Sequence, residues 1–165
     1  MPLYFAYGSN MSPRQMAMRC PGARPRGTAM LRDWRFIISK RGGANVIPAK
    51  DARVYGVLWQ INGAHIAALN GWEGVAQGVY RRMFLPVMTD RGPCMAVTYV
   101  SRRTWPGNAP VSYMTTAILP GAVSFALPQD YLQELESWLA PRPIGPRRVR
   151  YRGRRSQKRL ARNLS

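Results

Sequence analysis

The sequence has few residues of the kinds that bind metal ions or form disulfides. Its 165 residues include two cysteines, Cys20 and Cys94, and one histidine, His65. This set provides neither a disulfide framework nor a metal-ligand cluster, so we expect no metal site. A Ser-His-Asp or Cys-His catalytic site would have to use His65. Because His65 lies in an apolar stretch typical of a helix, we interpret it as an exposed or hydrogen-bonded helix residue.

Long hydrophobic runs are also missing. Although 46% of the residues are hydrophobic, no run approaches the roughly 18 consecutive apolar residues that a membrane-spanning helix needs. The first residues do not combine a basic stretch, an apolar stretch and a small-residue cleavage site. We therefore expect a cytoplasmic protein without a membrane span. Its length suits one domain with a substantial core.

Acidic residues are scarce: seven Asp and Glu stand against 25 Lys and Arg, a net charge of +18. Nine of the basic residues lie between Arg147 and Arg162, which leaves sixteen basic residues and the seven acids, a charge of +9, in the rest of the chain. We predict a folded domain over 1–143 and an arginine-rich segment over 144–165. This segment could bind nucleic acid or another polyanion by counterion release, or form a solvated, flexible end.

A polar turn, Tyr7-Gly8-Ser9-Asn10-Met11, follows the apolar run 3–6 near the N-terminus. Ser12 and Pro13 then form a typical helix start, with a helix expected to about Cys20. A strand that ends in Gly-Ser-Asn before a helix leaves backbone N–H groups without partners, and such groups can hold a ligand oxygen. The alternative is an ordinary turn.

The remaining chain reads as strands followed by helices. A central Gly56 in one strand indicates close approach of another group. A short helix should end at Asn70-Gly71, and a later helix could be kinked or ended by Pro120-Gly121. We expect an α+β fold, mainly antiparallel, with strands at 28–31, 34–39, 54–61, 83–88 and 94–100, a loop at 41–45, and helices at 64–69, 111–125 and from Pro128.

Glu73 is the acid whose context favours chemistry. It stands between Trp72 and Gly74, where partial burial would raise its pKa toward the range useful for proton transfer. The alternative is an ordinary surface acid. The other six acids are expected in loops (Asp33, Asp51), in a hairpin turn (Asp90) and on a terminal helix (Asp130, Glu134, Glu136).

Several short motifs follow one another along residues 3–139. They are the Tyr7–Met11 turn, Glu73-Gly74-Val75, Gly78-Val79-Tyr80, Pro110, Tyr113, Gly121-Ala122, Leu127-Pro128 and Tyr131-Leu132. In this order and spacing they resemble the γ-glutamylcyclotransferase-like family, which includes the AIG2-like proteins. The resemblance implies a small mixed, largely antiparallel β-barrel flanked by short helices.

The resemblance also implies an activity: the α-amino group of a γ-glutamyl amide attacks its own γ-carbonyl, releasing 5-oxoproline and an amine without a cofactor. Glu73 matches the catalytic acid/base. The substrate-binding residues implied are Tyr7, Gly8, Ser9, Asn10, Met11, Tyr99 and Tyr113, although core packing is the alternative for the tyrosines. The glutathione-specific branch of the family is associated with the motif Tyr-Gly-Ser-Leu. This chain has Tyr-Gly-Ser-Asn at that place, which argues against glutathione as the substrate.

Fold does not fix function. A non-catalytic member of this fold, or a nucleic-acid-associated protein that acts through Arg147–Arg162, therefore stays as an alternative. The leaving amine and the oligomeric state stay open.

Overall fold

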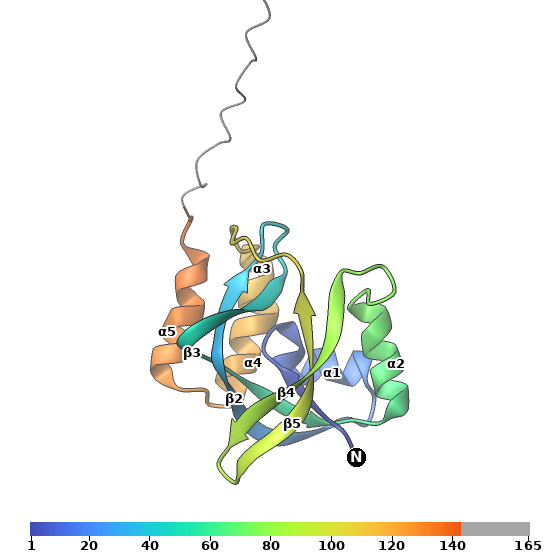
Figure 1. The fold of residues 1–165 in the computed structure, drawn as a ribbon. Coiled ribbons are helices and arrows are strands. Elements are labelled where there is room, and N and C mark those ends of the chain that lie inside the picture. The colour runs from blue at the N-terminus through green and yellow to red at the C-terminus, as the bar shows by residue number, and fades with distance from the viewer. Residues whose placement is uncertain (143–165) are drawn as a thin grey trace, which may run out of the picture.

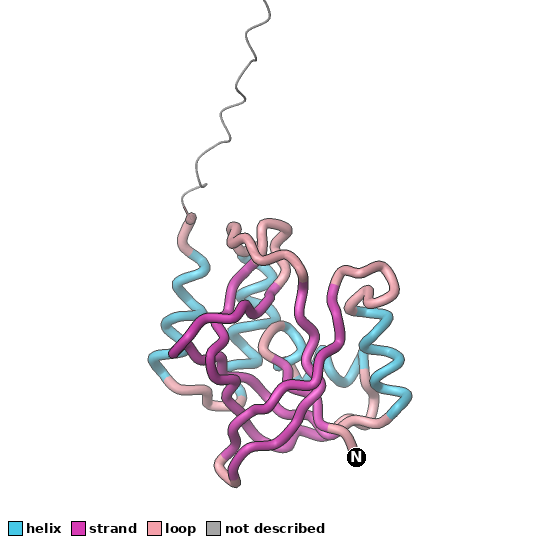
Figure 2. Tube along the Cα trace, viewed as in Figure 1, coloured by secondary structure: helices cyan, strands magenta, loops and turns pink. Residues whose placement is uncertain are grey.

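The computed structural model describes residues 1–142 (Figures 1 and 2). The arginine-rich segment 144–165, the predicted domain boundary and the predicted polyanion contact lie outside the described residues.

Five strands form a closed barrel in the order β1-β3-β2-β4-β5. They are β1 (Leu3–Ala6), β2 (Arg24–Ile38), β3 (Ala44–Gln60), β4 (Tyr80–Thr89) and β5 (Gly92–Ser101). Their pairings are antiparallel except where β1 meets β5 at Tyr4 and Val97. Helices lie on two sides of the barrel, with α1 and α2 on one side and α4 and α5 on the other (Figure 1). The expected fold class is confirmed.

The two longest strands differ from the sequence prediction. The segments expected at 28–31 and 34–39 belong to one strand, β2, and residues 44–45 of the expected loop already belong to β3. Asp33 (φ 61°) and Asp51 (φ 62°) therefore lie within strands and not in loops. The pairing of β2 and β3 shifts register next to Asp33, and Asp33 Oδ1 accepts a hydrogen bond from the Asp51 N–H at 2.9 Å. Asp tolerates the left-handed region, which permits this irregularity within a strand. Because Asp is also common in turns, the sequence does not distinguish the two cases.

The helices on the first side begin as predicted. Ser12 caps α1 (Pro13–Arg19), and Asn62 caps α2 (Gly63–Trp72). The prediction that α2 ends at Asn70-Gly71 is wrong, since the helix continues to Trp72. The Asn70 side chain accepts a hydrogen bond from the Tyr99 hydroxyl at 2.8 Å, so it does not compete for the helix backbone.

The helical segment on the second side passes through Pro120 without ending there. It consists of α3 (Val111–Tyr113), a π-helical turn η2 (Met114–Ile118) and α4 (Leu119–Ser124). In the π-helical turn, Leu119 N–H bonds to the Met114 carbonyl five residues back, and this wider register accommodates Pro120, which has no N–H. The segments α5 (Gln129–Glu136) and η3 (Ser137–Leu139) follow.

Two glycines allow close packing beside the first strand. A Cβ at Gly56 would lie 2.3 Å from the Ala6 carbonyl oxygen, so the predicted close approach is confirmed. A Cβ at Gly121 would lie 2.8 Å from backbone atoms of Met11 and Ser12, so only glycine lets α4 pack directly on the N-terminal loop. No helix in the described part of the chain is long and apolar enough to cross a membrane.

Candidate active site

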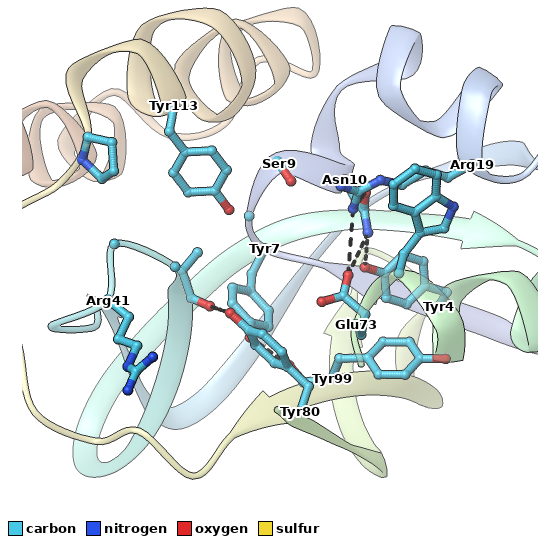
Figure 3. Close-up of a pocket in the computed structure, with 16 residues that line it drawn as sticks. Tyr4, Tyr7, Ser9, Asn10, Arg19, Arg41, Glu73, Tyr80, Tyr99 and Tyr113 are labelled. Atoms are coloured by element: carbon cyan, nitrogen blue, oxygen red, sulfur yellow. Dashed lines mark hydrogen bonds and ion pairs between the residues drawn. The ribbon is translucent and has the colours of Figure 1, made fainter. Parts of the chain in front are cut away.

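A pocket of about 410 Å³ opens where the end of β1, the end of α2 and the connection between β2 and β3 meet (Figure 3). Side chains from segments far apart in the sequence form its wall. The lining residues are Tyr4, Tyr7, Gly8, Ser9, Asn10, Arg19, Arg41, Gly42, Gly43, Ala44, Trp72, Glu73, Tyr80, Tyr99, Pro110 and Tyr113.

The structure brings nearly all of the predicted site residues to this pocket. Tyr7, Gly8, Ser9, Asn10, Glu73, Tyr99 and Tyr113 line it. Met11 does not: its side chain is fully buried in the hydrophobic core. The physical reason is the tight 3₁₀ turn η1 (Ser9–Met11), which directs Met11 inward against Gly121 while Ser9 and Asn10 stay at the pocket.

The N-terminal loop packs closely on the barrel wall. A Cβ at Gly8 would lie 3.0 Å from the Ala44 Cβ and 3.6 Å from the Tyr113 hydroxyl, so a larger residue would push the loop away from β3. The Met11 N–H bonds to the Gly8 carbonyl and closes the turn. Among residues 1–142, no backbone carbonyl accepts a hydrogen bond from the N–H groups of Ser9 and Asn10. The Ser9 N–H instead bonds to the Tyr113 hydroxyl, so the Asn10 N–H is the donor of this turn that a ligand oxygen could use.

Glu73 immediately follows α2, and its side chain is 16% exposed. Its Oε1 accepts a hydrogen bond from Asn10 Nδ2 at 3.2 Å and lies 3.7 Å from a guanidinium nitrogen of Arg19. Burial raises the pKa of the Glu73 carboxyl, while Arg19 and the Asn10 hydrogen bond act against this rise. A carboxyl with a raised pKa in a pocket is suited to proton transfer.

Tyrosines form much of the remaining wall. The Tyr7 hydroxyl donates to the Tyr99 carbonyl at 2.6 Å, and the Tyr80 hydroxyl donates to the Ala44 carbonyl at 2.6 Å. The Tyr4 hydroxyl accepts from Asn10 Nδ2 at 2.9 Å. Burial raises the pKa of Tyr99 to about 12 and raises the pKa of Tyr4, Tyr7, Tyr80 and Tyr113 as well. All five are therefore neutral phenols at physiological pH.

Sequence reasoning did not identify nine of the lining residues as part of the site, among them two tyrosines and two arginines: Tyr4, Tyr80, Arg19 and Arg41. Tyr80 belongs to Gly78-Val79-Tyr80, one of the motifs that carry the family resemblance, and this membership could have indicated a place in the site. The other three carry no local signal, because only the barrel closure and the packing of α1 on α2 bring them to Glu73 or to the pocket rim.

The histidine and the cysteines lie outside the pocket lining. His65 is buried, its Nδ1 accepts from the Asn62 N–H, and its Nε2 lies 2.9 Å from the Pro21 carbonyl. It is thus a hydrogen-bonded helix residue, as interpreted from the sequence. Among residues 1–142, no group of three or more His, Cys, Asp or Glu side chains is arranged to hold a metal ion.

Comparison with known proteins places this barrel and pocket in a family. Residues 53–135 match the model of the AIG2-like family. A mouse γ-glutamylcyclotransferase is 30% identical over 145 aligned residues, covering 82% of this chain and 77% of the mouse protein, and a human γ-glutamylcyclotransferase is 26% identical with the same coverage.

A solved structure named γ-glutamyl cyclotransferase superposes with a TM-score of 0.78 at 25% identity, covering 88% of this chain and 92% of that structure. The class defined by fold and sequence is therefore that of the γ-glutamylcyclotransferase-like proteins. This chain belongs to the AIG2-like family, and the resemblance inferred from its motifs is confirmed.

Proposed function

We propose that this protein is a γ-glutamylcyclotransferase that converts a γ-glutamyl amide to 5-oxoproline and a free amine. The observation that carries the proposal is the position of Glu73, a largely buried carboxylate that lines the same pocket as the Ser9–Asn10 turn. The similarity in sequence and structure to proteins named γ-glutamylcyclotransferase supports the same reaction class.

Glu73 would act as the proton carrier. A substrate α-ammonium group is not nucleophilic, so the carboxylate would first accept one of its protons. The α-nitrogen would then bond to the γ-carbonyl carbon, and the amide C–N bond would break as the departing nitrogen receives a proton from Glu73. Over the whole reaction, two protons leave the α-nitrogen and two reach the departing amine, so no net proton is released and no cofactor or water is consumed.

The turn at Gly8–Asn10 would stabilise negative charge on the substrate. The γ-carbonyl oxygen becomes an oxyanion in the tetrahedral intermediate, and backbone N–H donors are suited to hold it; removing one such donor typically costs about 3 kcal/mol. The α-carboxylate of the γ-glutamyl group is the other anion that these donors could bind. Either role uses the space next to Gly8, which the glycine leaves open toward Tyr113.

The tyrosine-lined wall would hold the γ-glutamyl chain bent for ring closure. The neutral phenol of Tyr113, which lies beside Gly8, can donate a hydrogen bond to the substrate without adding charge, whereas the Tyr99 hydroxyl already donates to Asn70 Oδ1. Well-oriented intramolecular reactions reach effective molarities of roughly 10⁵ M or more, so a pocket that fixes the bent conformer contributes directly to the rate.

The test is release of 5-oxoproline from a panel of γ-glutamyl amino acids, γ-glutamylamines and glutathione. Wild-type protein is expected to release it from at least one of the first two classes, and Glu73→Gln is expected to lose roughly 10²–10⁴-fold in kcat while staying folded. Glu136→Gln, which changes an exposed glutamate far from the pocket, is the matched control. The proposal is contradicted if wild type yields no 5-oxoproline, or if Glu73→Gln keeps the wild-type rate.

A further inference from the structure

We propose that Arg19 is a positioning residue that holds the Asn10 amide and one oxygen of Glu73, leaving the other carboxylate oxygen free for the substrate. This inference rests on the proposed function for its kinetic consequences, and on the geometry of the pocket alone for its structural part.

Arg19 is the last residue of α1, yet its guanidinium contacts side chains from two other elements. It donates to Asn10 Oδ1 at 2.9 Å and lies 3.7 Å from Glu73 Oε1. Its central carbon lies 4.9 Å from the centroid of the Trp72 ring. These three contacts join the end of α1, the N-terminal turn and the end of α2, and Figure 3 shows Arg19, Asn10 and Glu73 gathered at one side of the pocket.

The contact with Arg19 determines how the Asn10 amide is oriented. Asn10 Oδ1 accepts from Arg19 and also from Gln15 Nε2 at 3.1 Å. With its oxygen directed at these two donors, the amide presents Nδ2 to Glu73 Oε1 and to the Tyr4 hydroxyl. The reverse orientation would place the amide oxygen against a carboxylate oxygen and its NH₂ group against a guanidinium, which removes the hydrogen bonds with Glu73 and Arg19. Arg19 thus selects the orientation in which Asn10 donates to Glu73.

The two carboxylate oxygens of Glu73 differ in their contacts. Both the Asn10 hydrogen bond and the Arg19 ion pair go to Oε1. In the described part of the chain no hydrogen bond or ion pair involves Oε2, and Figure 3 shows this oxygen directed away from Asn10 and Arg19. We therefore assign proton transfer to Oε2 and anchoring to Oε1.

Arg19 also changes the charge balance at Glu73. It is the cation that lowers the pKa of this buried carboxyl, while the other ionisable groups that influence or are influenced by Glu73 are tyrosines from several strands and helices: Tyr4, Tyr7, Tyr80, Tyr99 and Tyr113. These phenols are neutral in the working pH range. Removing the guanidinium therefore leaves burial unopposed except by Asn10, and Glu73 holds its proton to a higher pH.

The experiment compares Arg19→Met, Arg19→Lys and the control Arg14→Met, which removes an arginine from the solvent side of the same helix. Arg19→Met is expected to lower kcat at least tenfold with little change in KM, and to move the acidic limb of the pH profile to higher pH. Arg19→Lys keeps the positive charge but lacks the planar, multiply donating guanidinium group. It should therefore lower kcat, while the acidic limb of its pH profile stays closer to that of wild type. Arg14→Met should match wild type.

A second readout does not require activity. The chain has three glutamates, Glu73, Glu134 and Glu136, so labelling with glutamate ¹³C at the carboxyl gives three NMR signals, and Glu73→Gln identifies the relevant one. Its titration should move to higher pH in Arg19→Met and not in Arg14→Met.

The outcomes separate this inference from the proposed function. Wild type that releases no 5-oxoproline, with a Glu73 titration that still depends on Arg19, contradicts the proposed function and supports the positioning geometry. A rise in KM at unchanged kcat in Arg19→Met would make Arg19 a substrate ligand and overturn the inference. An unchanged titration of Glu73 in folded Arg19→Met overturns it as well.

Discussion

The two ends of the pocket are built in different ways. At one end, Glu73 belongs to a network of side-chain hydrogen bonds that includes Asn10, Arg19 and Tyr4. At the other end, Arg41 is exposed on the connection between β2 and β3 and has no side-chain hydrogen bond or ion pair among residues 1–142. Figure 3 shows Glu73 and Arg41 on opposite sides of the Tyr80 ring.

The connection that carries Arg41 is nevertheless held in place by its backbone. The Ser39 N–H bonds to the Gly43 carbonyl and the Lys40 N–H to the Trp105 carbonyl, and a Cβ at Gly42 would lie 2.8 Å from the Pro110 ring. A fixed backbone with a free cation is suited to recognising part of a ligand, while a carboxylate held through one oxygen, with the other oxygen free, is suited to a reaction step. We therefore expect chemistry at the Glu73 end and recognition at the Arg41 end.

The strongest test of the Glu73 end is Asn10→Asp. The substitution keeps the shape but replaces the Nδ2 donor with an oxygen, so the hydrogen bond to Glu73 is lost and the Tyr4 hydroxyl must become the donor to residue 10. A second carboxylate beside Glu73 also raises the pKa of the pair, because two negative charges so close cannot both form easily. We expect a fall in kcat of about 10²-fold, with the acidic limb of kcat/KM moved to higher pH.

The pH dependence of kcat/KM measures this effect, and Asn62→Asp provides the control. Asn62 caps α2 by accepting from the His65 N–H, a role that Asp performs equally well. A wild-type profile in Asn10→Asp would show that the Asn10 amide has no part in the reaction, and the distinction between the two ends would then lose its basis.

A smaller effect is expected from Arg41→Gln at the recognition end. If Arg41 contacts a carboxylate on the departing amino acid, its loss should raise KM for γ-glutamylalanine roughly twofold to fivefold, the range of an exposed ion pair, and leave kcat unchanged. The carboxamide of the same substrate lacks that carboxylate and should show no change. Comparing the two substrates in wild type, Arg41→Gln and the hairpin-turn control Arg91→Gln isolates the interaction. A drop in kcat, or an equal change for both substrates, contradicts the assignment.

The sequence predicted the Glu73 end better than the Arg41 end for a physical reason. Tyr7-Gly8-Ser9-Asn10 and Glu73 carry local signals, namely a strand that ends in a polar turn and an acid between an aromatic residue and a glycine. Arg41 stood in a segment that reads as an ordinary loop, and its position at the pocket follows from the closure of the barrel.

The same distinction holds for the fold. Caps and breakers correctly located α1 and the start of α2, because the Ser12 and Asn62 side chains act on their own helices. The continuation of α2 past Asn70 depended on Tyr99, a residue 29 positions away. The inward direction of Met11 depended on Gly121, which only the packing of α4 brings beside it. Long-range contacts of this kind are not encoded in any short stretch.

The smallest predicted effect concerns stability at the Glu73 end. Because the folded protein raises the pKa of Glu73, ionising this carboxyl costs folding free energy: the folded state binds the proton more tightly than the unfolded state does. The contribution of Glu73 is therefore most favourable at acid pH and is lost as pH rises through its folded pKa. Glu73→Gln, which cannot ionise, should have a melting temperature equal to that of wild type at acid pH and up to a few degrees higher at neutral pH.

Thermal unfolding of both proteins at acid and neutral pH measures this difference, with Glu136→Gln as the control on an exposed residue. A variant that loses catalysis while gaining stability would show that the network at Glu73 holds a charge the fold disfavours, as expected for a residue kept for a reaction. A loss of stability in Glu73→Gln at neutral pH would instead show that the ion pair with Arg19 outweighs the cost of burial, and would make the Glu73 end a structural contact.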